Sequence, residues 1–348
     1  MRFRRAGTLL SYWQDGEQVF HNYAQRRCVA ANDSARWLLD QLGDWCSREQ
    51  LLALLPGYAP DSVDQAVRDL LAQGLLVAEG SPEAALDTAI TEQWAPWLPD
   101  AGLHFSTKDT AYVNRDSSAE LKAASLPDSP PPPSYKSQPG LPSIALPERQ
   151  AAQSAFQEVL LARRTHRRFS ERPLPLATVS QLLALCWGVT GHAETPTFGQ
   201  LPLKTSPSGG ARHPVEVYLM ALQVEGLAAG IYHYHPLEHR LAALNVAASP
   251  ELAARYCADQ RYTGQAAALF LMTAVFPRTM WKYHKARAYR VVLLDAGHLG
   301  QTFCLTATDL GLAPFCTAAL KDTLIEHDLG IDGVSESVLY VTGVGYPV

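Results

Sequence analysis

The residues with the clearest chemical potential form a basic run, RRTHRR, at positions 163–168. A guanidinium group keeps its charge at every relevant pH and matches the oxygens of a phosphate with two parallel hydrogen bonds. The run predicts either a receptor for a phosphate-bearing ligand or a solvated basic turn at a helix C-terminus, where positive charge is favourable. The residue types alone do not decide between these two interpretations.

Two further segments could contact a ligand. In SPSGGARHP (206–214), small residues let the backbone approach a flat ligand and a serine hydroxyl can hydrogen-bond to it. The alternative is an ordinary turn that enters a strand at Val215. Lys282 and Tyr283 could act as acid and base if they lie in a pocket. Taken alone, this pair is more typical of a solvent-facing helix start.

The segment GLAPFCTAAL (311–320) is a fourth candidate. Gly311 is expected to end a helix, and Ala318 and Ala319 are small enough to bring backbone N–H groups against a ring system. Taken alone, this segment is more typical of packing. His233 and His235 alternate along a predicted strand and therefore face one side of it. The sequence supplies no third ligand beside them, so no metal site is predicted.

The elements that must position these residues are mixed in the C-terminal part. Helical periodicity covers 151–164, 176–187 and 286–310, and strand-like apolar runs cover 215–224, 230–234, 267–275 and 338–344. The order is not a strict β-α-β repeat. It predicts an α+β fold in which a sheet surrounds a buried central helix at 286–310.

The N-terminal part predicts three short helices and a strand. The helices are expected at 31–42, 47–55 and 62–73, with Ser47 and Ser62 as capping residues, and the strand at 75–78 after Gly74. This order is typical of a winged-helix-like module. Residues 1–80 carry eight Lys and Arg against ten Asp and Glu, which disfavours nucleic-acid binding. A peptide bound along an exposed sheet edge is the preferred interpretation.

A proline-rich stretch, SPPPPSYKSQPGLPSIALP (129–147), separates the two parts. Proline at this density prevents helix and central strand, so the expected division is a module at 1–105, a linker at 106–150 and a larger domain at 151–348. The 348 residues are 47% hydrophobic and 18% charged, with a net charge of -5, which is typical of a folded protein without a nucleic-acid or membrane partner. No signal peptide, membrane span or C-x-x-C pair is recognised, so we expect a cytoplasmic protein with reduced, mostly buried cysteines.

The segments RRTHRRF, SPSGGARHPVEVY, GIYHYHP and WKYHKARAYRVVLLDAGHLGQTFCLTATDLGLAPF, taken in order, resemble the SagB-type dehydrogenases of the nitroreductase superfamily. The ordered set is more specific than any one segment and covers nearly all of residues 150–348. The N-terminal residues, including HFSTKDTAYVN (104–114), also resemble the first part of longer SagB-type chains.

The resemblance implies an α+β enzyme that binds FMN at the interface of an obligate homodimer. The helix that begins near Ala286 would form much of the dimer core, and Lys282 and Tyr283 would be catalytic. Residues of two loops would hold the cofactor. The phosphate would be bound by Arg163, Arg164, Thr165 and Arg167. The flavin ring would be lined by residues from the partner subunit, namely Pro207, Ser208, Gly209 and Gly210. Backbone N–H groups near Ala318 and Ala319 would face flavin N5.

Two departures from the family pattern bear on this expectation. Many nitroreductases carry basic residues after the last strand, whereas this sequence reads GVGYPV there. The arginine run must then supply more of the charge that holds a phosphate. A glycine-rich turn near N5 is replaced by Thr317, Ala318 and Ala319.

The expected activity is oxidation of thiazoline or oxazoline rings in a ribosomally made peptide, with Tyr283, assisted by the Lys282 charge, as the base. The N-terminal module would bind the peptide or a biosynthetic partner enzyme. Two alternatives remain open: another flavin reaction, such as NAD(P)H-dependent reduction of nitro or quinone compounds or oxidation of a non-azoline peptide, and a non-catalytic scaffold.

Overall fold

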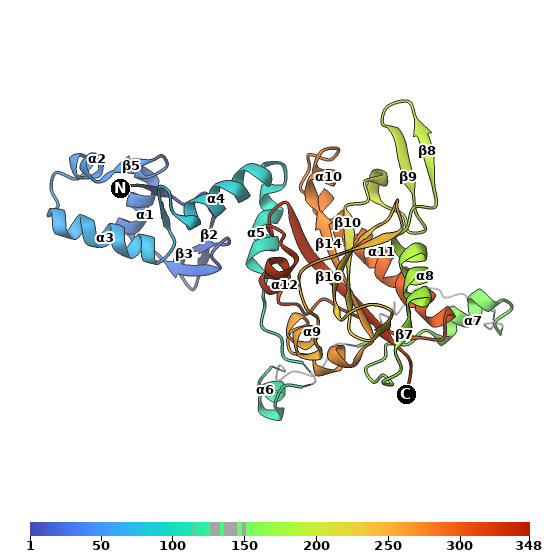
Figure 1. Cartoon of the computed structure of the whole chain (residues 1–348). Helices are drawn as coiled ribbons and strands as arrows, with labels where there is room; N and C mark the ends of the chain where they lie inside the picture. Colours follow the sequence, from blue (N-terminus) through green and yellow to red (C-terminus); the bar gives the residue numbers. More distant parts are fainter. Residues whose placement is uncertain (115, 126–132, 136–144, 148–150) are drawn as a thin grey trace.

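The computed structural model describes residues 1–114, 116–125, 133–135, 145–147 and 151–348. A small N-terminal unit and a larger C-terminal unit are joined by helices α4 and α5 (Figure 1). Most of the proline-rich stretch expected as a linker lies outside the described residues. In the described part of the chain, no helix is long and apolar enough to cross a membrane.

An antiparallel six-stranded sheet forms the centre of the C-terminal unit. Every residue of β10 except Glu216 is buried, and so is every residue of β14 except Val275, because helices cover both faces of the sheet. The expected α+β architecture is confirmed. The strands, in spatial order, are β13 (Arg240–Ala243), β12 (Gly230–His235), β10 (Val215–Ala221), β14 (Ala268–Val275), β16 (Glu336–Gly345) and β15 (Ala313–Thr317).

Two helices pack on one face of this sheet. Helix α8 (Leu176–Trp187) has the bounds that its sequence periodicity predicts, and α11 (Ala288–Asp309) is one or two residues shorter at each end than expected. The inner side of α11 is buried, but Leu293 and Leu294 are 42% and 61% exposed. Within a single chain, the expected central helix is therefore buried on one side only. Helices α9 (Pro250–Tyr256) and α12 (Asp322–Leu329) cover the opposite face.

The first helix of this unit is shorter than its predicted range. Helix α7 (Ala155–Ala162) is capped by the Ser154 side chain, and Arg163 already has an extended ψ of 122°. The arginine run therefore follows the helix as open chain. The structure also contains elements that were not predicted: the hairpin of β8 (Gly191–Thr195) and β9 (Gly199–Leu203), and the strands β13 and β15 with helices α9, α10 (Phe276–Met280) and α12. These are short, so hydrophobic periodicity is a weak indicator for them.

The three predicted N-terminal helices are present as α1 (Asp33–Gln41), α2 (Arg48–Leu54) and α3 (Pro60–Ala72). Ser47 and Gln50 form the expected capping box on α2. The expected cap Ser62 is wrong, because α3 begins earlier, with Ala59 at the cap position and Pro60 in the first turn. Proline fits that position because its missing N–H has no partner there.

The strands of the N-terminal unit form two small sheets. The predicted strand after Gly74 is β6 (Leu76–Ala78), which pairs with β1 (Arg2–Arg5), and β1 also pairs with β5 (Cys46–Ser47). The sheet is thus completed from the N-terminus and not by a wing that follows the third helix. A separate meander consists of β2 (Leu9–Gln14), β3 (Glu17–Asn22) and β4 (Arg27–Ala30).

The two units share one aromatic core. Helix α4 (Pro82–Gln93), the short turn η1 (Ala95–Trp97) and α5 (Leu98–Ser106) carry Trp94 and His104 onto Phe276 and Tyr289 of the larger unit. The Trp94 indole also donates a hydrogen bond to the Val334 carbonyl at 3.0 Å. Residues before position 105 therefore contribute directly to the core of the C-terminal unit.

The first part of the expected linker is attached to the C-terminal unit. Lys108 forms a buried ion pair with Glu326 at 2.5 Å, and the Asp109 amide donates to the Asp322 carboxylate at 3.0 Å. Asn114 donates to the Ala258 carbonyl at 2.9 Å. Residues 107–114 thus form a strap along α12 and the loop before the turn η3 (Arg261–Gln265).

Candidate functional site

The glycine loop and the Lys-Tyr pair meet in the structure although Gly210 and Lys282 are 72 positions apart in the sequence. Gly210 has φ of +63°, and a Cβ atom there would overlap Tyr283 Oη and lie 2.8 Å from Lys282 Nζ. Lys282 Nζ also lies 3.5 Å from the Gly210 carbonyl oxygen, within hydrogen-bonding reach. Glycine is required here both for the left-handed backbone and for the space it leaves.

A buried carboxylate holds this loop against α11. Ser208 Oγ donates to Asp295 at 2.5 Å, and the Gly209 amide donates to the same carboxylate at 3.3 Å. Ser208 Oγ accepts from the His213 amide at 2.9 Å. Burial raises the pKa of Asp295, and the two donated hydrogen bonds oppose that shift. The sequence prediction missed Asp295, although a lone acid inside the apolar run VVLLDAG is a recognisable indication of a buried partner.

The Lys-Tyr pair is held from two other directions. Trp97 donates from its indole to the Tyr283 carbonyl at 2.8 Å, so the N-terminal part of the chain contacts the candidate site directly. Lys282 Nζ lies 4.2 Å from the ring centroid of Phe198, which is in the turn of the β8–β9 hairpin. Trp97 was also missed by the sequence prediction, since nothing local links it to position 283.

The arginine run lies beside β15. The His166 amide donates to the Pro314 carbonyl at 2.9 Å, and the Arg167 guanidinium is 5.7 Å from the ring centroid of Tyr262. Among the described residues, neither Arg163, Arg164 nor Arg167 forms an ion pair with a carboxylate. Arg164 and Arg167 are exposed, as is Thr165.

Ala318 and Ala319 lie at the end of the same strand. The Ala319 amide donates to Thr317 Oγ1 at 3.2 Å, and the Ala318 carbonyl accepts from Tyr112 at 3.4 Å. The expected donor at Ala319 is therefore engaged within the turn. Ala318 is exposed, and its amide has no hydrogen-bond partner among the described residues.

The two groups of candidate residues do not converge within one chain. The loop at 207–210 leads into β10, whereas the arginine run and Ala318 lie at β15, and β14 and β16 separate these strands. At about 4.8 Å per strand, β10 and β15 themselves are about 14 Å apart. The arginines have no carboxylate partner among the described residues, which fits a phosphate, but the strand order does not bring them to the loop at 207–210.

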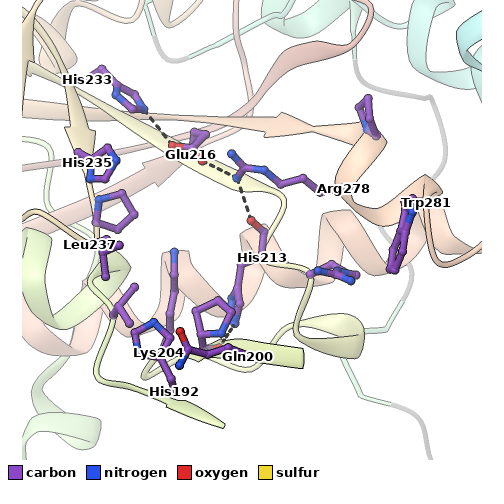
Figure 2. A pocket seen from close by; sticks show the side chains of 15 residues that line it. His192, Gln200, Lys204, His213, Glu216, His233, His235, Leu237, Arg278 and Trp281 are labelled. Carbon is purple, nitrogen blue, oxygen red and sulfur yellow. Dashed lines mark hydrogen bonds and ion pairs between the residues drawn. The ribbon is translucent and has the colours of Figure 1, made fainter. Parts of the chain in front are cut away.

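A cavity of about 860 Å³ (Figure 2) has in its lining Trp281, the residue that precedes Lys282. Its walls come from the β8–β9 hairpin, β10, β12 and α10. His233 and His235 both line it, as their alternation predicts. His233 is hydrogen-bonded to Glu216 at 2.9 Å, and His235 accepts from the Glu238 amide at 3.1 Å. In the part of the chain that the structure describes, no group of three or more His, Cys, Asp or Glu residues is placed to hold a metal ion.

The cysteines are all free thiols. Cys186, Cys257 and Cys304 are buried as expected, but Cys28 is exposed, and Cys46 and Cys316 are half-buried. Cys304 and Cys316 are close neighbours, with their sulfur atoms 3.4 Å apart.

Comparison with known proteins identifies a family and several relatives of this chain. The model of the Nitroreductase family matches residues 160–346. The trifolitoxin-processing protein TfxB of Rhizobium leguminosarum bv. trifolii is 31% identical over 175 residues, which are 48% of this chain and 47% of TfxB. The protein MJ1384 of Methanocaldococcus jannaschii, which is named as a nitroreductase, is 32% identical over 177 residues. These residues are 51% of this chain and 84% of MJ1384.

A third relative is the microcin B17-processing protein McbC of Escherichia coli. It is 28% identical over 144 residues, which are 40% of this chain and 53% of McbC. The matched region thus spans about half the length of each of the two processing proteins.

Proposed function

Because the chain belongs to the nitroreductase family, we propose that it is an FMN-dependent oxidoreductase of the SagB type that oxidises thiazoline or oxazoline rings in a ribosomally made peptide. The observation that carries the proposal is the contact of Lys282 and Tyr283 with the Gly210 loop. Two relatives, TfxB and McbC, are named for the processing of peptide toxins, which supports a peptide substrate.

Two sets of residues fit the chemistry of FMN, one its phosphate and the other its flavin ring. Arg163, Arg164, Thr165 and Arg167 would bind the phosphate, since these arginines have no carboxylate partner among the described residues and guanidinium groups match phosphate oxygens. Pro207, Ser208, Gly209 and Gly210 of the partner subunit would line the flavin ring, with Ala318 and Ala319 on the first subunit. Because the Ala319 amide is already bonded to Thr317, Ala318 is the better candidate for a free donor. When bound, FMN supplies the acceptor for a hydride.

The chain itself would supply the proton chemistry. Aromatisation of an azoline ring removes two hydrogens, one as hydride and the other as a proton from the neighbouring carbon. The Tyr283 phenolate is the proposed base for that proton. The positively charged Lys282 ammonium would stabilise this phenolate. Trp97 fixes the Tyr283 backbone, and the Gly210 loop sets the position of its hydroxyl.

The test begins with the visible spectrum of the purified full chain and the identity of any cofactor that acid releases. We expect about one FMN per chain. Lys282→Ala and Tyr283→Phe should retain FMN and lose most of the turnover of an azoline peptide, roughly 100-fold or more, as expected when an acid–base group is removed. Lys285→Ala is the matched control, because Lys285 is an exposed lysine of the same segment. Wild-type turnover in both site variants would refute the assignment, and a colourless protein that does not take up FMN would favour the scaffold alternative.

The N-terminal unit is proposed to bind the peptide or a partner enzyme. Between α1 and α3 it has an apolar groove of about 710 Å³, lined by Trp37, Leu54, Tyr58 and Val63 among others. Deleting residues 1–105 would also remove Trp94 and His104 from the shared core, so a substitution is the better test. In the same assay, Trp37→Asp should raise the KM for peptide and leave FMN content unchanged. An unchanged KM would contradict this role.

One rival activity has its own support. MJ1384 is named for the nitroreductase family, and its match covers 84% of its length. An NAD(P)H-dependent reductase would bleach its flavin rapidly with NADPH in the absence of peptide. The proposed azoline oxidase should do so slowly.

A further inference from the structure

The cavity that has Trp281 in its lining is formed by residues to which the proposed chemistry gives no role. Figure 2 shows Lys204, His213 and Glu216 around it, with Arg278 and Trp281 at one side. Its volume of about 860 Å³ is in the range of small-molecule sites, which are usually about 300–1,000 Å³. The cavity is therefore large enough for part of a ligand, and its charge indicates which part.

Positive charge exceeds negative charge in the lining of this cavity. Among the described residues that line it, Lys204, Arg212 and Arg278 are cationic and Glu216 is acidic. The two Glu216 oxygens are engaged by Arg278, through an ion pair, and by His233 at 2.9 Å. Neither Lys204 nor Arg212 forms an ion pair with any described carboxylate, and Glu216, whose charge also acts on Lys204, is already engaged by Arg278.

The two cations are partly removed from water. Lys204 has no hydrogen-bond partner among the described residues, and burial lowers its pKa. Arg212 stacks over the Trp281 ring at 5.1 Å, and its Nε is buried without a hydrogen-bond partner. Burial, together with the charges of Lys204, Arg212 and Arg278, lowers the pKa of His213 to about 4. An isolated buried charge is costly, and an oxyanion placed between these groups would remove that cost.

The position of the cavity relates it to the candidate site. Arg212 and His213 follow Gly210 after one intervening residue, Ala211, and Trp281 directly precedes Lys282. Apolar residues such as Val189 and Leu237 complete the lining. The Phe198 ring links the cavity to the candidate site, because its centroid lies 6.2 Å from that of Trp281 in the cavity wall and 4.2 Å from Lys282 Nζ. A ligand that places an anionic group against Lys204 and Arg212 would therefore occupy a cavity whose wall adjoins Lys282.

We propose that this cavity is an oxyanion site, in which Lys204 and Arg212 bind a carboxylate or phosphate of a molecule that reaches the Lys282–Tyr283 pair. The source we infer is the side-chain carboxylate of an acidic residue near the modified residue of a peptide substrate, and this assignment rests on the proposed function. The other source of the same chemistry is the phosphate of a reduced nicotinamide nucleotide.

Calorimetry on the full chain tests the site without requiring turnover. The probes are inorganic phosphate, the blocked peptides Ac-Gly-Glu-Gly-NH2 and Ac-Gly-Gln-Gly-NH2, and NADPH compared with NADH. We expect the Glu peptide to bind at least tenfold more tightly than the Gln peptide. Lys204→Gln and Arg212→Gln should each weaken the Glu peptide and phosphate by about tenfold, as expected for loss of one charge-assisted hydrogen bond. Lys285→Gln is the control and should change neither affinity.

The outcomes separate the possible failures. Retained binding in Lys204→Arg, with a native thermal melt for each variant, shows that the losses do not come from unfolding. Preference for NADPH over NADH, without preference for the Glu peptide, would support the oxyanion site and overturn the peptide source. Equal affinities in wild type and both Gln variants, or no binding of any probe, would overturn the site. Anion binding by a protein that lacks FMN or oxidises no peptide would contradict only the proposed function.

Discussion

Gly210 lies where the loop at 206–214 meets Lys282 and Tyr283. At this position there is space for the hydrogen atom of glycine but not for a Cβ atom. Its φ of +63° and its contact with Tyr283 and Lys282 make it sensitive to a single methyl group. We predict that Gly210→Ala lowers turnover at least tenfold, because the added methyl group must displace the Tyr283 hydroxyl. The measurement is kcat with FMN content determined in the same sample.

A matched control separates displacement from backbone strain. Gly199 has a similar φ of +66°, but a Cβ atom there would have no heavy atom within 4 Å. Gly199→Ala should cost about 1 kcal/mol of stability, as a left-handed non-glycine residue does, and leave turnover near the wild-type value. Equal turnover in the two variants would show that the contact with Tyr283 does not position the site.

At the scale of elements, α5 is held to the C-terminal unit by a histidine that must stay neutral. His104 is 4% exposed, stacks on Trp94 at 4.9 Å and is hydrogen-bonded to Tyr289 at 2.9 Å. Burial lowers its pKa to about 3. Below about pH 6.5 the unfolded chain takes up a proton that the folded chain does not, so stability falls as the pH falls from 6.5 toward 3.

This linkage gives a measurable pH dependence. Between pH 7.5 and pH 5, His104 should contribute a loss of about 2 kcal/mol of unfolding free energy. His104→Phe keeps an aromatic ring in the stack but does not titrate, and it should lose about 1 kcal/mol at all pH values because Tyr289 loses its partner. Urea unfolding at both pH values measures the difference. An identical pH dependence in wild type and variant would contradict the role of His104.

At the scale of the whole molecule, the single chain leaves the proposed flavin site open. The loop at 207–210 and the arginine run are separated by two strands, while α11 exposes Leu293 and Leu294 and α7 exposes Leu160. The proposed homodimer, in which each flavin would contact two chains, would account for both the apolar surfaces and the divided site.

Disruption of α11 tests the proposed dimer. Leu294→Glu should convert a dimer into a monomer, measured by light scattering after gel filtration, and should lose FMN at the same time because half of each flavin site would be absent. Leu121→Glu is the control, since Leu121 is 57% exposed on α6 (Ala119–Ala124), away from α11 in sequence. A Leu294→Glu protein that remains dimeric, or a monomer that keeps its FMN, would refute this arrangement.

Local patterns in the sequence were sufficient for the elements that depend on neighbouring residues. The bounds of α8, the capping box of Ser47 with Gln50 and the buried strand β14 follow from periodicity, capping chemistry and apolar runs. The cap of α3 was misplaced because Pro60 and Ser62 are both acceptable starting signals and the local pattern does not rank them. The candidate segments 163–168, 206–214, 282–283 and 311–320 could be chosen by residue type.

Only the tertiary structure decided how those segments are combined. It brought Gly210 to Tyr283, Asp295 to Ser208 and Trp97 to the backbone of Tyr283, and it kept the arginine run on another edge of the sheet. It also gathered Lys204, Arg212 and Glu216 around one cavity. Periodicity and caps depend on interactions within a few residues, whereas these contacts depend on strand order and on packing between segments far apart in the chain, which no local pattern records.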